Sequence, residues 1–157
     1  MFEVYLIKVY YIWRADMICA FFGHRDCPDS IKSKLFETIK SQIEQGTTQF
    51  YVGNNGKFDA MVLSCLRELK KEYPEIHYTV VLAYIPKNSG IYQPEETIIP
   101  EGIELVPKHF AIDFRNRNMV EKADMVIAYV SRSVGGAAKY VNKAKSKGAK
   151  IINLAKE

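Results

Sequence analysis

Short apolar runs alternate along this chain with segments whose apolar residues recur every three or four positions. The runs have the length of strands, and the segments between them have the period of helices. Strands separated by helices in this rhythm pair in parallel through right-handed crossovers. The sequence therefore predicts an α/β three-layer sandwich with a mainly parallel five-stranded sheet. Its strands are expected at Met17–Phe22, Gln49–Val52, Tyr78–Ile85, Asp124–Val130 and Ala149–Leu154.

Turn and capping residues bound the helices between these strands. The expected helices begin at Asp29 or Ser30, begin again after Gly56, and then cover Ala111–Ala123 and Gly135–Lys147. Residues 86–107 interrupt the alternation with four prolines. A loop of this length in a compact domain is often functional, so a lid over a ligand and a plain irregular connection are both open.

The 157 residues and the hydrophobic fraction of 48% are enough for one core, so residues 17–157 are expected to form a single domain. Residues 1–16 are apolar and aromatic, but Glu3 and Lys8 interrupt them and they are too short to span a membrane. No signal-peptide cleavage site follows, so a cytoplasmic protein without a membrane partner is expected. The first 16 residues could be an edge strand, a partner-binding segment or a misassigned start.

Charge and cysteine content exclude several classes of site. The 22 Lys and Arg residues exceed the 18 Asp and Glu residues by four and are scattered, which favours a small anionic ligand and makes nucleic acid an unlikely partner. Cys19, Cys27 and Cys65 form no CxxC pair and have no metal-ligand spacing, so neither a disulfide framework, a metal site nor a cofactor is expected. Cys19 and Cys65 lie in apolar patterns and are expected in the core, whereas Cys27 lies in a loop beside His24 and Arg25, where a reactive thiol is possible.

Glycine-containing turns follow three of the expected strands. They are Gly23-His24-Arg25, Gly53-Asn54-Asn55-Gly56 and Gly135-Gly136. In a parallel sheet all three meet at the carboxyl edge, where glycine lets the backbone approach a phosphate and the next helix offers unpaired N–H groups. For Gly135-Gly136, close packing of helix on strand is the alternative. No G-x-G-x-x-G or GK[ST] motif is present, which argues against ordinary dinucleotide oxidoreductases and NTPases.

The order of these segments resembles the SLOG superfamily, whose fold is Rossmann-like. The resemblance rests on Ala20–Arg25, Gly53–Asp59, Arg115-Asn116 with Met119-Val120 and Asp124, and Gly135-Gly136, and it covers residues 17–154. The superfamily includes Log-type phosphoribohydrolases, DprA-like DNA-processing proteins and many small phage and bacterial proteins. It implies binding of a nucleotide or a nucleotide-derived ligand. The matching positions are Gly23, Arg25, Gly53, Gly56, Asp59, Arg115, Asn116, Gly135 and Gly136.

Physical chemistry suggests a role for each polar candidate. Arg25 and Arg115 can pair with phosphate oxygens. Ribose hydroxyls or a base edge could be read by Asn54, Asn55 and Asn116. Asp59 could accept from a ribose hydroxyl or could serve as a favourable charge in the first turn of a helix. His24 could be a phosphate ligand, an acid/base or a structural residue.

One departure from the phosphoribohydrolases bears on the function. Their glycine pair continues through Gly and Thr to a catalytic glutamate, whereas no carboxylate occurs here between Ser131 and Lys150. Cleavage of an N-glycosidic bond needs a carboxylate. The predicted function is therefore binding of a nucleotide-derived signalling ligand, as a sensor or sequestering protein. The alternative is a nucleotide N-glycosidase or phosphoribohydrolase that uses Asp59, Asp113 or Glu121.

A homo-oligomer is also expected, because domains of this kind often pair through helix faces. The aromatic residues of the first segment could supply an apolar contact surface. They are Tyr5, Tyr10, Tyr11 and Trp13.

Overall fold

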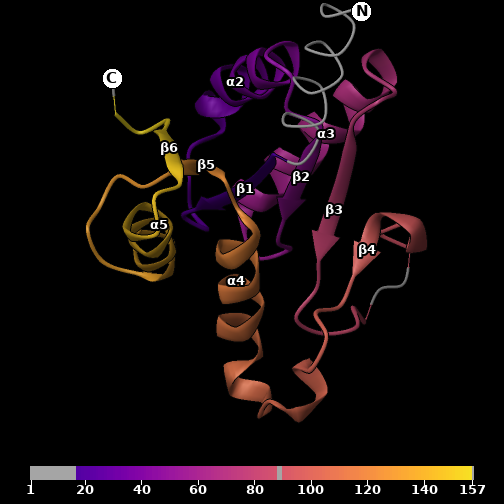
Figure 1. Cartoon of the computed structure of the whole chain (residues 1–157), viewed down its shortest axis with the longest axis vertical. Coiled ribbons are helices and arrows are strands. Elements are labelled where there is room, and N and C mark those ends of the chain that lie inside the picture. Colours follow the sequence, from indigo (N-terminus) through magenta and orange to yellow (C-terminus); the bar gives the residue numbers. More distant parts are fainter. Residues whose placement is uncertain (1–16, 88–89, 157) are drawn as a thin grey trace, which may run out of the picture.

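The computed structural model describes residues 17–87 and 90–156, which share one parallel sheet (Figure 1). Its strands are β1 (Ile18–Gly23), β2 (Gln49–Val52), β3 (His77–Val81), β4 (Thr97–Ile98), β5 (Met125–Tyr129) and β6 (Lys150–Asn153). Their order is β4-β3-β2-β1-β5-β6, and every pair is parallel. This confirms the predicted α/β Rossmann-like sandwich, with six strands among the described residues rather than five.

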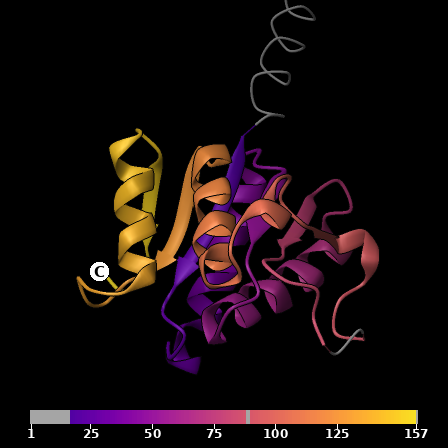
Figure 2. The same cartoon turned by 90° about the horizontal axis from the view of Figure 1, so that it is seen from below.

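Helices cover both faces of the sheet (Figures 1 and 2). One face packs against α2 (Lys32–Glu44) and α3 (Lys57–Glu72), and the other against α4 (Ala111–Lys122) and α5 (Gly136–Ser146). Successive residues of β1 point to opposite faces, so Phe21 joins the α2/α3 core and Phe22 joins the α4/α5 core. A strand buried on both sides needs a continuous apolar run, which is why this strand was visible in the sequence.

The strand that the sequence pattern did not reveal is β4, which lies inside the supposed loop 86–107. It has only two residues, paired in register as Val80↔Thr97 and Val81↔Ile98. A pair of residues carries no detectable period, so only the pairing with β3 identifies it. The third strand is correspondingly shorter than expected and ends at Val81 instead of Ile85.

A buried carboxylate anchors the segment that contains β4. Glu96 is 6% exposed and accepts hydrogen bonds from Arg67 at 3.1 and 2.6 Å and from the Tyr78 hydroxyl at 2.9 Å. The backbone N–H of Gln93 donates to the same carboxylate at 2.8 Å. These donors lower the pKa of Glu96 against the effect of its burial, so the segment is tied to α3 and β3 by an ionised group.

The cysteines belong to the interior. Cys27 is 1% exposed and packs in the α2/α3 core, and burial raises the pKa of its thiol. The burial of Cys27 therefore argues against a reactive thiol there. Cys19 and Cys65 are buried as expected. Among the described residues, no helix is long and apolar enough to cross a membrane. The possible edge strand at residues 1–16 lies outside the described residues.

Candidate functional site

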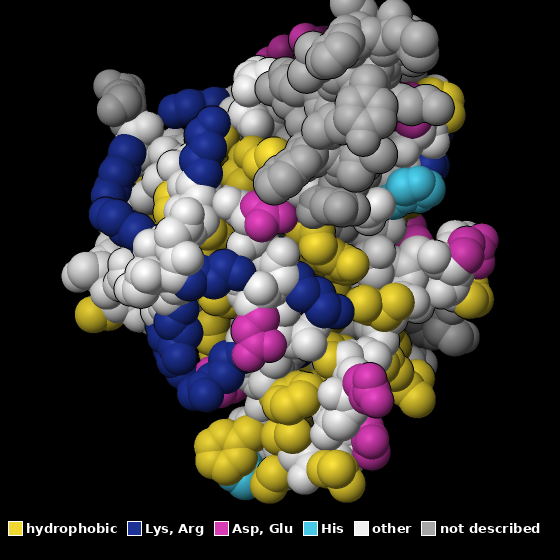
Figure 3. Space-filling model, in the orientation of Figure 1, with side chains coloured by type: hydrophobic (Ala, Val, Ile, Leu, Met, Phe, Trp, Pro, Cys, Tyr) yellow, Lys and Arg dark blue, Asp and Glu magenta, His cyan; other side chains and the backbone are white. Residues whose placement is uncertain are grey.

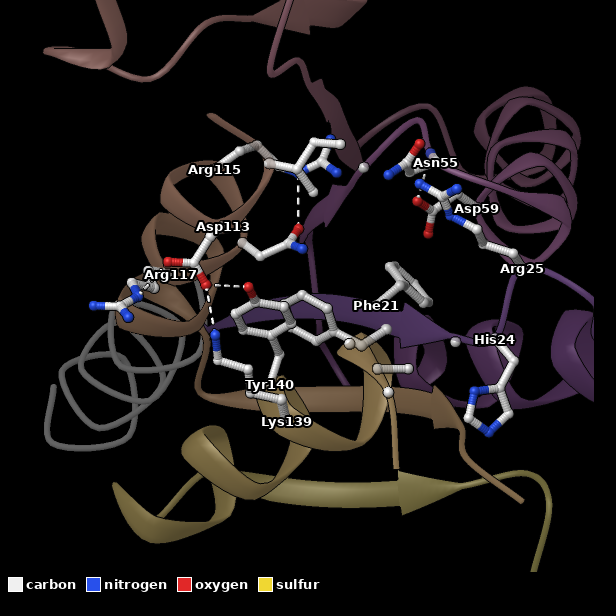
Figure 4. Close-up of a pocket in the computed structure, with 18 of the residues that line it drawn as sticks. Phe21, His24, Arg25, Asn55, Asp59, Asp113, Arg115, Arg117, Lys139 and Tyr140 are labelled. Atoms are coloured by element: carbon white, nitrogen blue, oxygen red, sulfur yellow. Dashed lines mark hydrogen bonds and ion pairs between the residues drawn. The ribbon is translucent and has the colours of Figure 1, made fainter. Parts of the chain in front are cut away.

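A pocket of about 690 Å³ opens at the carboxyl edge of the sheet (Figure 4). Its walls come from the turn after β1, the starts of α3 and α5, and the first two turns of α4. Of the residues expected at the site, ten line this pocket: Gly23, His24, Arg25, Gly53, Asn55, Asp59, Arg115, Asn116, Gly135 and Gly136. The other two do not line it: Asn54 accepts a hydrogen bond from Arg115, and Gly56 is the residue that precedes α3.

Arg115, from α4, is buried in the pocket wall and joins three segments by hydrogen bonds. It is 1% exposed, and its Nη1 donates to Asn54 Oδ1 at 2.9 Å and to the carbonyl of Val81 at 3.0 Å. Its Nε donates to Asn116 Oδ1 at 2.7 Å. Burial lowers the pKa of Arg115 and the nearby Asp59 opposes this, but a guanidinium stays charged. The amide oxygens of Asn54 and Asn116 therefore accept from a buried cation, and their expected contact with a ribose or a base edge stays a prediction.

Asp59 faces this cation across Gly53. Its Oδ2 accepts the backbone N–H of Asn55 at 2.9 Å, and its burial raises its pKa to about 6. The Asn55 N–H and the positive charges of Arg115 and Arg25 oppose that rise. A Cβ on Gly53 would lie 3.0 Å from Asp59 Oδ2 and 3.1 Å from the Arg115 guanidinium. The absence of a side chain at Gly53 thus lets the two charged groups approach each other.

Two other glycines are required by packing. A Cβ on Gly23 would lie 2.2 Å from the ring of Phe58, a buried residue in the first turn of α3. Gly56 has a φ of +100°, and a Cβ there would lie 2.7 Å from the backbone of Arg25. Both positions would need glycine whether or not a ligand binds.

The turn before α5 is open by contrast. Gly135 has a φ of +105°, and a Cβ on Gly135 or Gly136 would meet nothing within 4 Å. No side chain caps the helix, and its first turn contains no acidic residue. The first N–H groups of a helix have no partner within it, so here they face an open pocket at the positive end of the dipole. This is the geometry of an anion site.

His24 is a structural residue of the pocket. It is 5% exposed, and its Nε2 accepts the backbone N–H of Ser131 at 3.0 Å. Burial and the nearby Arg132 lower the pKa of His24. The neutral ring therefore ties the turn after β1 to the loop that precedes α5. Of the readings that the sequence left open, this contact favours the structural one.

A charged cluster at one end of the pocket was only partly visible in the sequence. Asp113 Oδ1 accepts from Lys139 Nζ at 2.9 Å and from the Tyr140 hydroxyl, and Oδ2 accepts from Arg117 Nε at 2.8 Å. The i,i+4 spacing of Asp113 and Arg117 was a usable signal. Tyr140 had no such signal, because it occupies an apolar position of α5. The cluster joins the first turns of α4 and α5.

More positive than negative side chains line the pocket, together with four aromatic residues. Positive charges line it at Arg25, Arg115, Arg117, Arg132 and Lys139, against the carboxyl groups of Asp59 and Asp113. Arg132 also pairs with Asp26 at the rim, at 2.9 Å. The aromatic lining is Phe21, Phe22, Phe110 and Tyr140. Within residues 17–87 and 90–156, no group of His, Cys, Asp and Glu is arranged to hold a metal ion.

The described residues of the segment 86–107, which are 86–87 and 90–107, contribute none of the residues that line the pocket. They include β4 at the edge of the sheet and are held there by Glu96, so the structure does not show them closing over the pocket. The interpretation as a plain irregular connection is incomplete, because the segment contains β4. No protein-family model and no curated protein matches the sequence.

Proposed function

We propose that this protein binds a nucleotide or a nucleotide-derived ligand, as a sensor or sequestering protein, with a phosphate at the start of α5. The observation that supports this most strongly is the open N-terminus of α5 facing a cationic pocket. An anion there would gain the free N–H groups of Gly136 and Ala137 and the nearby charge of Lys139. The volume of about 690 Å³ lies within the range of small-molecule sites.

The rest of the pocket suits a ligand with a sugar and a flat ring. Asp59 and Asn55 line the wall beside Arg25, where a carboxylate oxygen can accept from a ribose hydroxyl. Among the aromatic residues that line the pocket, Phe110 is 54% exposed, so its ring is open to a flat base. Aromatic side chains bind flat bases by stacking. A base, a ribose and a phosphate thus each have a matching surface.

The test is ligand capture. The purified chain is incubated with a mixture of nucleotides, ADP-ribose and cyclic nucleotides, washed and denatured, and the released compounds are identified by mass spectrometry. Ala137→Asp adds a carboxylate to the first turn of α5, which suits the helix dipole but repels a phosphate. We expect this variant to fold normally and to lose capture.

A matched control adds the same charge elsewhere. Ser33→Asp lies in the first turn of α2, outside the pocket, and should capture ligand as the parent does. Equal capture by the Ala137→Asp variant would contradict a phosphate at α5. Recovery of nothing from the parent protein would contradict the proposed function.

One observation favours N-glycosidic cleavage as a second candidate function. Asp59 lines the pocket with a pKa raised to about 6, so it can exchange a proton near neutral pH. In the capture assay an enzyme would release a free base and a ribose phosphate. Asp59→Asn should then abolish these products while intact ligand is still bound. Recovery of intact ligand alone from the parent would rule this candidate out.

A further inference from the structure

The side of the molecule formed by α5 and β6 is strongly basic. Residues 131–156 contain one Arg and six Lys but no Asp or Glu. All seven of these side chains are exposed. Figure 3 shows Lys and Arg gathered on the left, over the side where Figure 1 places α5 and β6. We call this surface the basic side.

The opposite edge of the sheet is acidic. Residues 90–107, which contain β4, include four Glu and no Lys or Arg. Glu96 is buried against Arg67, but Glu95, Glu101 and Glu104 are exposed. We call this surface, over residues 90–107, the acidic side. It lies at the far end of the sheet from β6, since the strand order begins with β4 and ends with β6.

The two sides also differ in surface relief. On the basic side, two adjacent hollows of about 290 and 430 Å³ share Val141, Asn142, Asn153 and Lys156. The larger one is lined in part by Lys145 and Ile151. The acidic side carries protruding apolar residues instead. They are Ile91 (53% exposed), Ile98 (38%), Ile99 (47%) and Leu105 (84%).

Each side carries an edge strand of the described sheet. Among the described strands, β6 pairs only with β5, and β4 pairs only with β3. The N–H groups of Lys150 and Leu154 donate toward β5, to Asp124 at 3.0 Å and Ala128 at 2.7 Å. Alternate residues of a parallel strand point the other way, so the backbone of Ile151 faces outward. Such edges are templates for pairing with another chain.

We infer that copies of this chain associate head to tail, with the acidic side of one copy on the basic side of the next. The two surfaces have opposite charge, one carries exposed apolar side chains where the other has hollows, and each contains an edge strand of the described sheet. A symmetric pairing of two basic sides would instead bring lysines together. Because the two surfaces differ, the contact is heterologous and produces a ring or an open chain. The inference does not rest on the nucleotide site.

Charge-reversal variants of the full chain test this inference. Lys145→Glu with Lys156→Glu places two carboxylates at the hollows of the basic side, and Glu101→Lys with Glu104→Lys places two lysines on the acidic side. None of these four residues lines the site pocket. Light scattering and sedimentation of the parent should show a mass above the monomer that rises with concentration and falls with salt. Each double variant alone should be a monomer, and an equimolar mixture should regain the assembled mass.

Several results would overturn the inference. They are a monomeric parent at every concentration, assemblies that both double variants leave unchanged, and a mixture that stays monomeric. A monomeric parent that binds an acidic peptide or a nucleic acid would also overturn it, because the basic side would then serve a different partner. Thermal unfolding checks that each variant folds. If a reversal prevents folding, Lys145→Gln with Lys156→Gln replaces it and should lower the assembled mass.

Discussion

The N-termini of α3 and α5 lie at the same pocket, and each follows a glycine. The two glycines differ in what surrounds them. At α3, the protein itself fills the space: Arg25 packs on Gly56, and Asp59 accepts the N–H of Asn55. At α5, Gly135 has nearly the same backbone conformation but nothing lies within 4 Å of an added Cβ. The start of α3 is therefore closed by its own side chains, whereas the start of α5 is open to a ligand.

This difference shows that a glycine turn does not identify an anion site by itself. What decides is whether neighbouring side chains occupy the space that glycine leaves. The following predictions test the contrast, beginning with the largest expected effect.

Gly23→Val, beside the start of α3, should lower the free energy of unfolding most. The new Cβ would lie 2.2 Å from the Phe58 ring, so α3 must shift at its first turn. We expect a loss of about 4 kcal/mol in the free energy of unfolding, at the upper end of overpacking effects. Denaturant unfolding measures it. A loss below about 1 kcal/mol would show that Phe58 can move aside, and that Gly23 is not needed for packing.

Asp59→Asn should change how stability depends on pH. The pKa of Asp59 rises from 3.8 to about 6 on folding, so its protonated form is favoured in the folded state. Its contribution to stability is therefore complete below 3.8 and is lost as pH rises through about 6. The asparagine does not titrate, so between about pH 4 and pH 8 the parent should lose about 3 kcal/mol relative to the variant. Denaturant unfolding at a series of pH values measures the difference, and a constant difference would contradict it.

Gly56→Ala and Gly135→Ala form a matched pair for the two helix starts. Both residues have a φ near +100°, so each alanine incurs backbone strain of about 2 kcal/mol. At Gly56 the clash with Arg25 should add about 1 kcal/mol or more. Denaturant unfolding of both variants gives the comparison. Equal losses of stability in the two variants would mean that Arg25 moves aside at little cost. The space at the start of α3 would then not be closed by Arg25.

His24→Ala should have the smallest effect, on the loop before α5. It leaves the N–H of Ser131 without its acceptor, at a cost of about 1 kcal/mol. Hydrogen exchange of residues 131–135 should become faster, while the start of α3 is unchanged.

A glutamine at the same position separates the hydrogen bond from the titration. Because the pKa of His24 is lowered on folding, the parent should lose protection in this loop as pH falls. His24→Gln keeps an acceptor that does not titrate, so its protection should be independent of pH. Equal pH dependence in the parent and this variant would show that His24 does not hold the loop.

The sheet was largely predictable because its strands carry their own signal. β1 is buried on both faces and appears as an apolar run, and the helices on either side have clear apolar periods. β4 was not predictable, since two residues have no period and depend on β3 for their definition. The anchor at Glu96 depends on Arg67, which is 29 residues away in sequence.

The residues of the pocket were easier to name than their roles. Glycine after a strand points to the carboxyl edge, and the structure brings those turns together. It could not be foreseen that Phe58 occupies the space at Gly23, or that Asn54 orients Arg115, because these contacts join separate elements. The role of Tyr140 was equally hidden. Its position in α5 fits the apolar core, but its hydroxyl donates to Asp113 in α4.

The position of β1 between β2 and β5 has a consequence for how the protein is made. Cys19 pairs with Met125, more than a hundred residues later in the chain. Most of the chain must therefore be synthesised before β1 can pair with both β2 and β5. Contacts this distant slow the folding reaction. The pocket straddles the same junction, because Arg25 and Asp59 come from the early half and Arg115 and Lys139 from the late half. A compound that occupies the pocket would contact both halves, so its binding should protect α3 and α5 together against proteolysis.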